Sequence, residues 1–168
     1  MTNYIVCDMI MPTIKFTKDE NGIQQVKEAV NDLANTIVDP DRKKLYMLVI
    51  RGFRFIERHE IPANRELFFS TMLEENTPYT IRLVKELKYH QPLLEFRVNW
   101  RGAGAFRAIF FEYEYEGQKV LVFTRATIKQ QTTSSEFEKL VVESEEIYMS
   151  FLHHPEQYIN LEGVNKVE

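Results

Sequence analysis

Several features that would define a protein class are scarce in this sequence of 168 residues. It has one cysteine, Cys7, so no disulfide can form within the chain, and a reducing compartment is expected. No apolar run approaches the roughly 18 residues that a membrane span needs. No basic segment precedes the short apolar run at the N-terminus, which argues against a signal peptide. These absences predict a cytoplasmic protein that does not act in a membrane.

The chain also lacks an excess of positive charge. Its formal net charge of −4 argues against nonspecific binding to nucleic acid. The charge is unevenly distributed, however: residues 81–107 contain six basic and two acidic residues, whereas residues 134–168 contain eight glutamates and two lysines. A basic centre can bind a polyanion locally despite the overall balance, and ordinary solvated surface charge is the alternative interpretation.

Hydrophobic periodicity predicts an α+β domain. Apolar residues at three- and four-residue spacing predict a helix from Ile23 to Ile37 and a second helix from Pro40 to about His59, with Asp39 as its N-cap. A short strand is expected at residues 14–16, a third, shorter helix at 64–75, and a C-terminal amphipathic helix at 135–151. Residues 79–87 fit either a short strand or an extended segment that leads into the next strand. A sheet would supply the apolar surface that these helices need to cover.

The stretch from Leu93 to Lys129 predicts three consecutive strands. In the first, Leu94, Phe96 and Val98 alternate with polar residues, which is the period of a strand with one buried face. Residues 106–115 and 120–126 are rich in aromatic and β-branched residues. The connections at residues 102–104 and 116–118 are short, so an antiparallel meander is the expected pairing. Because the glycine-rich segment 102–104 precedes a strand and not a helix, it fits a hairpin turn better than a phosphate-binding loop.

In this order of elements, the sequence resembles the RelE/ParE toxin superfamily, and within it the phage-derived, HigB-like branch. The resemblance is carried by five segments in order: FTKDENG (16–22), DPDRKKL (39–45), KELKYHQPLLEFR (85–97), FRAIFFE (106–112) and IKQ (128–130). It implies a single RelE-like domain over 1–168, in which an antiparallel sheet packs against an N-terminal helix pair and a C-terminal helix. Residues 1–13 would be an N-terminal extension, 61–80 an insertion and 156–168 a loose tail.

The sequence also departs from the family pattern. The late element reads Thr127–Ile128–Lys129–Gln130, so its usual aromatic residue and second lysine are missing. Leu94 stands where a tryptophan is common in the family, and the chain is longer and more acidic than a typical ribonuclease toxin. These departures leave a catalytically inactive member of the fold as an alternative.

The resemblance implies the toxin component of a type II toxin–antitoxin system, a ribosome-dependent mRNA endonuclease that needs no metal or other cofactor. Its partners would be mRNA on the ribosome and a small antitoxin protein, with a homodimer left open. The alternative is an inactive protein-binding module of phage or mobile-element origin, since a fold does not fix a function.

Cleavage of RNA by its 2′-hydroxyl needs a base near that hydroxyl and a cation beside the phosphorane-like transition state. Arginine suits the second role because its planar fork matches phosphate oxygens and stays charged. The motif position of Arg107 makes it the first candidate, followed by Arg97 and Lys129, with Glu95 as a base or as the partner that holds Arg97. Further residues predicted to bind RNA are Arg82, Lys85, Lys88, Arg101 and Arg125.

Each candidate also has a purely structural interpretation. Arg97 and Glu95 can form an ion pair on the sheet, Arg107 can stack on aromatic rings, and Lys129 can be a solvated strand end. A lone histidine in a loop, His90, is more often inert than catalytic. His153–His154 has no carboxylate or cysteine at ligand spacing, so no metal site is predicted.

Overall fold

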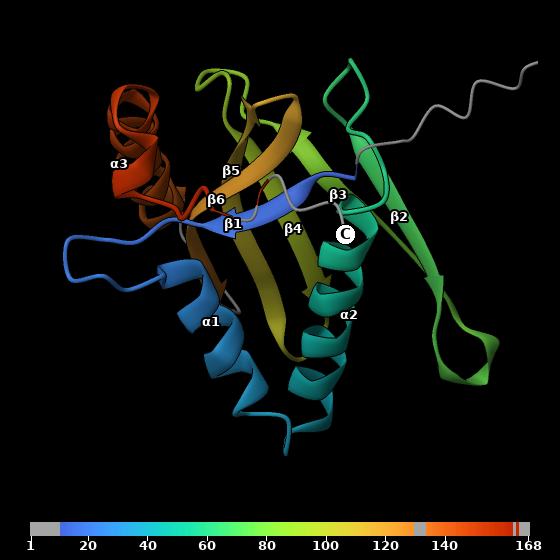
Figure 1. Cartoon of the computed structure of the whole chain (residues 1–168). Coiled ribbons are helices and arrows are strands. Elements are labelled where there is room, and N and C mark those ends of the chain that lie inside the picture. The colour runs from blue at the N-terminus through green and yellow to red at the C-terminus, as the bar shows by residue number, and fades with distance from the viewer. Residues whose placement is uncertain (1–10, 130–133, 163, 165–168) are drawn as a thin grey trace, which may run out of the picture.

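The structure is a computed structural model that describes residues 11–129, 134–162 and 164. In chain order its elements are β1 (Thr13–Phe16), α1 (Gln25–Ala34), α2 (Pro40–Ile56), β2 (Leu67–Met72), β3 (Pro78–Glu86), β4 (Leu94–Trp100), β5 (Gly104–Tyr115), β6 (Gln118–Lys129) and α3 (Ser134–His153), with short 3₁₀ turns at Glu74–Asn76 and Pro155–Gln157 (Figure 1). Residues 1–10, which include Cys7 and most of the expected N-terminal extension 1–13, lie outside the described residues, as does the segment 130–133. The predicted α+β class is confirmed.

The six strands form one mixed sheet in the order β1-β6-β5-β4-β3-β2. The meander β4-β5-β6 is antiparallel as predicted, and Glu116 and Gly117 both have positive φ in its second turn (48° and 78°), as a tight two-residue hairpin requires. A wholly antiparallel sheet, however, was a wrong expectation, because β1 pairs with β6 in parallel, with Thr13 beside Val120. A parallel pair needs a long crossover, and the chain between these two strands passes through two helices and four strands.

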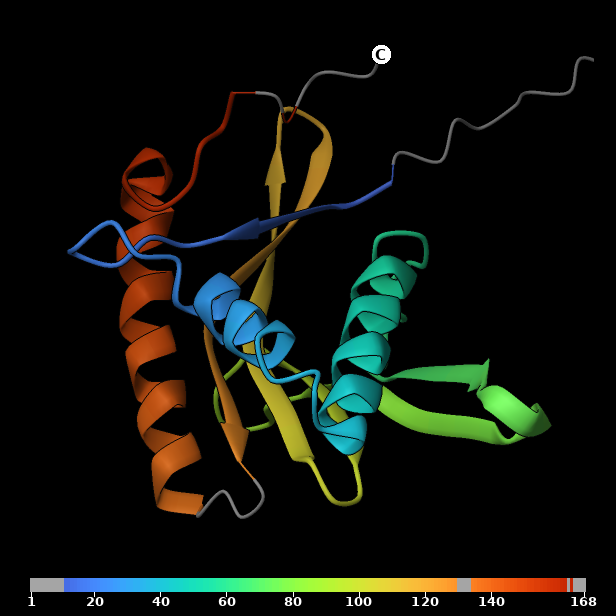
Figure 2. The ribbon, with the colours of Figure 1, turned by 90° about the horizontal axis from the view of Figure 1, so that it is seen from below.

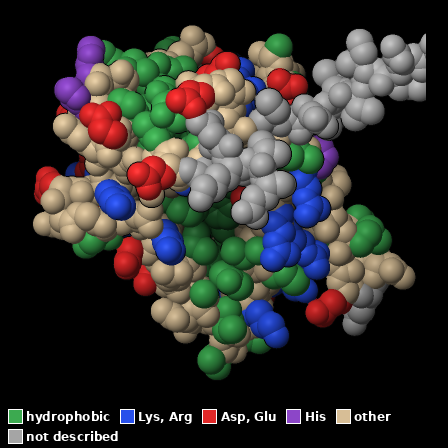
Figure 3. All heavy atoms as spheres, viewed as in Figure 1, with side chains coloured by type: hydrophobic (Ala, Val, Ile, Leu, Met, Phe, Trp, Pro, Cys, Tyr) green, Lys and Arg blue, Asp and Glu red, His purple; other side chains and the backbone are tan. Residues whose placement is uncertain are grey.

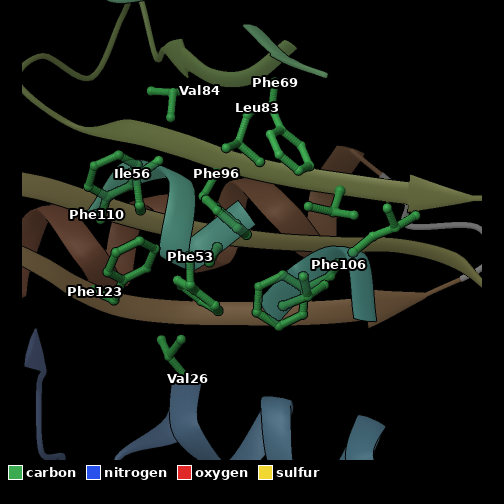
Figure 4. Packing of buried hydrophobic residues seen from close by; sticks show 14 of the residues in the cluster. Val26, Phe53, Ile56, Phe69, Leu83, Val84, Phe96, Phe106, Phe110 and Phe123 are labelled. Atoms are coloured by element: carbon green, nitrogen blue, oxygen red, sulfur yellow. The ribbon is translucent and has the colours of Figure 1, made fainter. Parts of the chain in front are cut away.

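The helices cover opposite faces of the sheet. Helices α1 and α2 pack on one face, where the largest group of buried residues lies, and α3 packs on the other (Figure 2). The first face is filled by phenylalanines (Figure 4): Phe53 of α2 stacks on Phe96 with ring centroids 4.6 Å apart, and Phe110 stacks on Phe123 at the same distance. On the second face, Phe111 and Phe151 pack edge to face at 5.1 Å. The central strands are therefore buried on both faces.

The short helix expected at residues 64–75 is wrong, because the chain forms strand β2 there. In β2, Phe69 is buried and pairs with Ile81 of β3, while Phe68 and Met72 are 58% and 55% exposed. The apolar residues of this segment fit a helical spacing as well as a strand. The strand forms because pairing with β3 gives the backbone N–H and C=O groups of β2 long-range hydrogen-bond partners and buries Phe69.

The described part of the C-terminal tail differs from the expected loose segment. Ile159 and Val164 are each 4% exposed and belong to the core under α3. The carbonyl oxygen of Tyr158 accepts a hydrogen bond from the Lys18 backbone N–H at 2.9 Å. The tail through residue 162 is therefore anchored to the loop that follows β1.

Candidate functional site

Strand register brings the main candidate residues to one face of the sheet. Along β4, the core-facing Leu94, Phe96 and Val98 alternate with Glu95, Arg97 and Asn99. Arg97 lies directly opposite Arg107 of β5, and Ala105, the neighbour of Asn99, pairs on its other side with Lys129 of β6. These side chains point away from the phenylalanine core, toward the face on which α3 packs. We call this surface, defined by Arg97, Arg107 and Lys129 with Lys85 and Arg101, the cationic sheet face.

Glu95 is the buried anion of this face, with no exposed side-chain surface. Its Oε1 lies 2.7 Å from Nε of Arg107, and its Oε2 lies 3.3 Å from Nζ of Lys85. The ion pair with Arg97 that the sequence suggested is therefore not formed. Because a buried charge is costly unless it is paired, Glu95 is well placed to hold two cations and poorly placed to reach a substrate.

Arg107 is held from two sides. Its Nε donates to Glu95, and its guanidinium carbon lies 3.5 Å from the ring centroid of Phe137 of α3. Stacking on an aromatic ring was the structural alternative for Arg107, and the ring that it contacts belongs to the C-terminal helix. The side chain is 15% exposed, and its terminal nitrogens make no hydrogen bond within the described part of the chain.

Helix α3 neutralises two further candidates. Lys129 pairs with Glu136 and Arg125 pairs with Glu143, the latter at 2.9 Å between Nε and Oε2. The glutamates of α3 therefore neutralise cations of β6, which lie outside the basic centre at residues 81–107.

Three other candidates have no neutralising partner in the described part of the chain. Arg97, Arg101 and Lys88 form no side-chain hydrogen bond or ion pair with any residue that the structure describes. Arg97 and Arg101 line an open hollow of about 430 Å³ at the turn between β4 and β5, together with Asn99 and the glycines of the turn. Arg82, by contrast, pairs with Glu66, the residue before β2, at 2.9 Å.

The turn beside this hollow is fixed by contacts that the sequence did not predict. Trp100 Nε1 donates to Oδ1 of Asp41, at the start of α2, at 3.2 Å. Tyr79 donates its hydroxyl to the carbonyl oxygen of Asn99 at 2.8 Å, and burial raises the pKa of this tyrosine. Gly102 has a φ of 88°, and a β-carbon there would collide with the Asp41 carboxylate. The turn therefore holds Arg97 and Arg101 on a rigid support.

His90 is not the isolated loop histidine that the sequence suggested. Its Nδ1 lies 2.6 Å from Oε1 of Glu145, and its Nε2 lies 3.5 Å from Oε2 of Glu138. Both glutamates belong to α3, so His90 ties the loop between β3 and β4 to that helix. No local signal in the sequence could reveal this contact, because it joins positions 55 residues apart.

The described residues offer neither a metal site nor a membrane-spanning helix. They contain no group of three or more histidine, cysteine, aspartate or glutamate side chains arranged to hold a metal ion. None of their helices is both long enough and apolar enough to cross a membrane.

Comparison with known proteins leaves the site to be interpreted from its own geometry. No protein-family model matches the chain, and no curated protein or solved structure is significantly similar to it.

Proposed function

We propose that the cationic sheet face binds RNA, and that the chain is a toxin-like, ribosome-dependent mRNA endonuclease that acts in the cytoplasm and is controlled by a small antitoxin protein. The observation that carries the proposal is the pairing of Arg97 with Arg107 on adjacent strands. Like charges directly opposite each other destabilise a sheet. Of these two arginines, Glu95 compensates Arg107 but not Arg97, so a bound phosphate would relieve the repulsion and complete the arrangement.

In this proposal the two arginines have different roles. Arg97, which lines the open hollow, would contact the scissile phosphate and stabilise its transition-state charge. Arg107 would add its terminal nitrogens from the inner side, oriented by Glu95 through Nε. Because Glu95 is buried between Arg107 and Lys85, it would act as a positioning residue and not as the base. The element order strand, helix pair, meander and C-terminal helix fits the RelE-like architecture that the resemblance implied.

A second candidate function is a catalytically inactive protein-binding module. It is favoured by the glutamates of α3, which neutralise Lys129 and Arg125 and so remove two of the cations that a nuclease would present to its substrate. In that case the hollow at the β4–β5 turn would bind an acidic segment of a protein.

Induced expression in bacteria separates the two functions. We expect the wild-type chain to arrest growth and to produce new mRNA 5′ ends, and Arg97→Ala to lower the cleavage rate by about 10²-fold, the usual cost of removing one donor that stabilises transition-state charge. Lys139→Ala is the matched control, because this lysine of α3 is 78% exposed and should not affect cleavage. Normal growth with wild-type and Arg97→Ala chains alike, at equal protein levels, would reject the nuclease and favour the binding module.

A further inference from the structure

Helix α2 carries a second cationic surface, on the opposite side of the sheet from α3. From Arg42 to Arg58 the chain has six basic residues and one acidic residue, Glu57. Figure 3, which shows the side on which α1 and α2 lie, has Lys and Arg side chains gathered over α2. The positive charge that the sequence places at residues 81–107 is therefore only part of the basic surface.

The helical repeat sorts these cations into two groups. The buried face of α2 carries Leu45, Leu48, Val49, Gly52, Phe53 and Ile56. Lys43 and Arg54 are exposed on the outward side of the helix, and the exposed Arg58 lies in the turn that follows its last residue, Ile56. A rise of 1.5 Å per residue places Arg54 about 16 Å along the helix from Lys43. We call these three residues the α2 stripe.

The cations beside the stripe have structural partners, whereas those of the stripe have none among the described residues. Arg42 donates to the Thr36 hydroxyl at 2.6 Å, and Arg51 donates to the Thr71 hydroxyl and the Met72 carbonyl at 3.3 Å. Lys44 lies 4.0 Å from a carboxylate oxygen of Glu74. Lys43, Arg54 and Arg58 make no hydrogen bond or ion pair to any residue that the structure describes. The contacts within the described residues therefore give these three exposed cations no structural role.

The stripe is continuous with the cationic sheet face. The N-terminal end of α2 lies against the β4–β5 turn, where Asp41 accepts the hydrogen bond from Trp100 (Figure 2). Lys43 follows Asp41 by two residues, and Arg101 follows Trp100 by one. The unpartnered cations therefore run from Arg97 and Arg101, around this edge of the sheet, and onto the outer side of α2. An extended row of cations of this kind suits a flexible polyanion, whose successive negative charges could each contact one of them.

We propose that Lys43, Arg54 and Arg58 bind the phosphate backbone of the same RNA strand whose reacting segment lies at Arg97. The inference rests on the proposed RNA-binding function and extends it, because it assigns a long single strand as the preferred ligand. Single-strand binding sites span about 4–16 nucleotides. A strand of about 5 nucleotides, near the lower end of this range, would occupy the cationic sheet face alone. A strand of about 20 nucleotides exceeds the range and would be long enough to reach the α2 stripe as well.

Fluorescence polarisation with labelled single-stranded RNAs of these two lengths tests the inference. Replacing Lys43, Arg54 and Arg58 together with alanine should weaken binding of the longer RNA about tenfold or more and lower its salt slope by about 2, because each lost phosphate contact removes about 0.7 from the slope. Binding of the shorter RNA should not change. The matched control replaces Lys18, Lys27 and Lys139 with alanine, which removes the same charge from exposed sites elsewhere.

A second variant, Arg97→Ala/Arg101→Ala, distinguishes failure of this inference from failure of the proposed function. Unchanged affinity and salt slope for the longer RNA in the α2 variant would overturn the inference, whatever the second variant does. Weakening in the α2 variant with no effect of Arg97→Ala/Arg101→Ala would reject the sheet face, and with it the shared strand that the inference requires, and would leave the stripe as a separate RNA site. An equal loss in the charge-matched control would show nonspecific attraction only and would also overturn the inference. Circular dichroism confirms that each variant is folded.

Discussion

Replacing Arg107 with alanine is expected to lower the free energy of unfolding by about 3 kcal/mol, because it leaves a fully buried carboxylate with one cation in place of two. Glu95 would keep only Lys85, at 3.3 Å, and the ring of Phe137 would lose the guanidinium that stacks on it. Removal of one partner from a buried ion pair commonly costs about 3–5 kcal/mol. We expect the lower end of this range because Lys85 would still partly compensate the Glu95 carboxylate. Urea unfolding followed by circular dichroism measures the change.

Two further variants test the cause of this loss. Arg101→Ala removes an exposed arginine without a described partner, so it should change stability by less than about 0.5 kcal/mol. Glu95→Gln/Arg107→Ala should lose about 1 kcal/mol less than Arg107→Ala, because no uncompensated charge stays buried. A loss below about 0.5 kcal/mol in Arg107→Ala itself would show that the pair contributes little to the fold.

The stability of the Arg107 contacts also decides how activity data should be interpreted. A chain with Arg107→Ala that fails to cleave RNA could fail because it is partly unfolded. Arg97, which has no described partner, gives the cleaner test of the site. Arg107→Ala therefore measures mainly the structural contribution of this pair of opposite residues, and Arg97→Ala measures mainly the functional one.

Phe123→Ala is expected to destabilise the fold by about 3–5 kcal/mol, the usual cost of truncating a fully buried phenylalanine. Phe123 has no exposed surface, stacks on Phe110 at 4.6 Å and packs edge to face against Phe53 at 5.3 Å. Its loss would open a cavity between the sheet and α2 that the rigid rings around it cannot fill. Thermal and urea unfolding would detect the change in the folded protein.

Phe68→Ala is the matched control for this prediction. Phe68 is 58% exposed on β2, so the same truncation should cost less than about 0.5 kcal/mol. If the two variants were equally stable, the phenylalanine cluster around Phe123 would not be the main core of the domain.

The elements that local patterns determine were predictable from the sequence. Alternation along residues 94–100 and the Glu116–Gly117 turn predicted strands β4 to β6 and their pairing, and the Asp39–Pro40 start predicted α2. Alternation does not reveal strand direction, so the parallel pairing of β1 with β6 was missed. At residues 67–72 the apolar spacing fitted either structure, and pairing with β3 decided in favour of a strand.

The site was predictable only as a set of residues on one face. The period of two placed Glu95 and Arg97 on the same side of β4, but the partner of Glu95 is set by the register of β5, which brings in Arg107. The contacts of Arg125 and His90 depend on how α3 docks on the sheet, and no spacing along the chain encodes that. Periodicity along α2 predicts a helix but not which of its basic residues have partners, so the α2 stripe is recognisable only from the structure.

Ultraviolet cross-linking of a short single-stranded RNA to the wild-type chain, followed by mass spectrometry of the attached peptides, tests the cationic sheet face most directly. If Arg97 and Arg101 contact the phosphate backbone, the cross-links should lie in residues 97–105, the end of β4 and its turn, and should be lost in Arg97→Ala/Arg101→Ala. Cross-links elsewhere on the chain that persist in this variant, or none at all under conditions in which a known single-strand-binding protein reacts, would contradict RNA binding at this face.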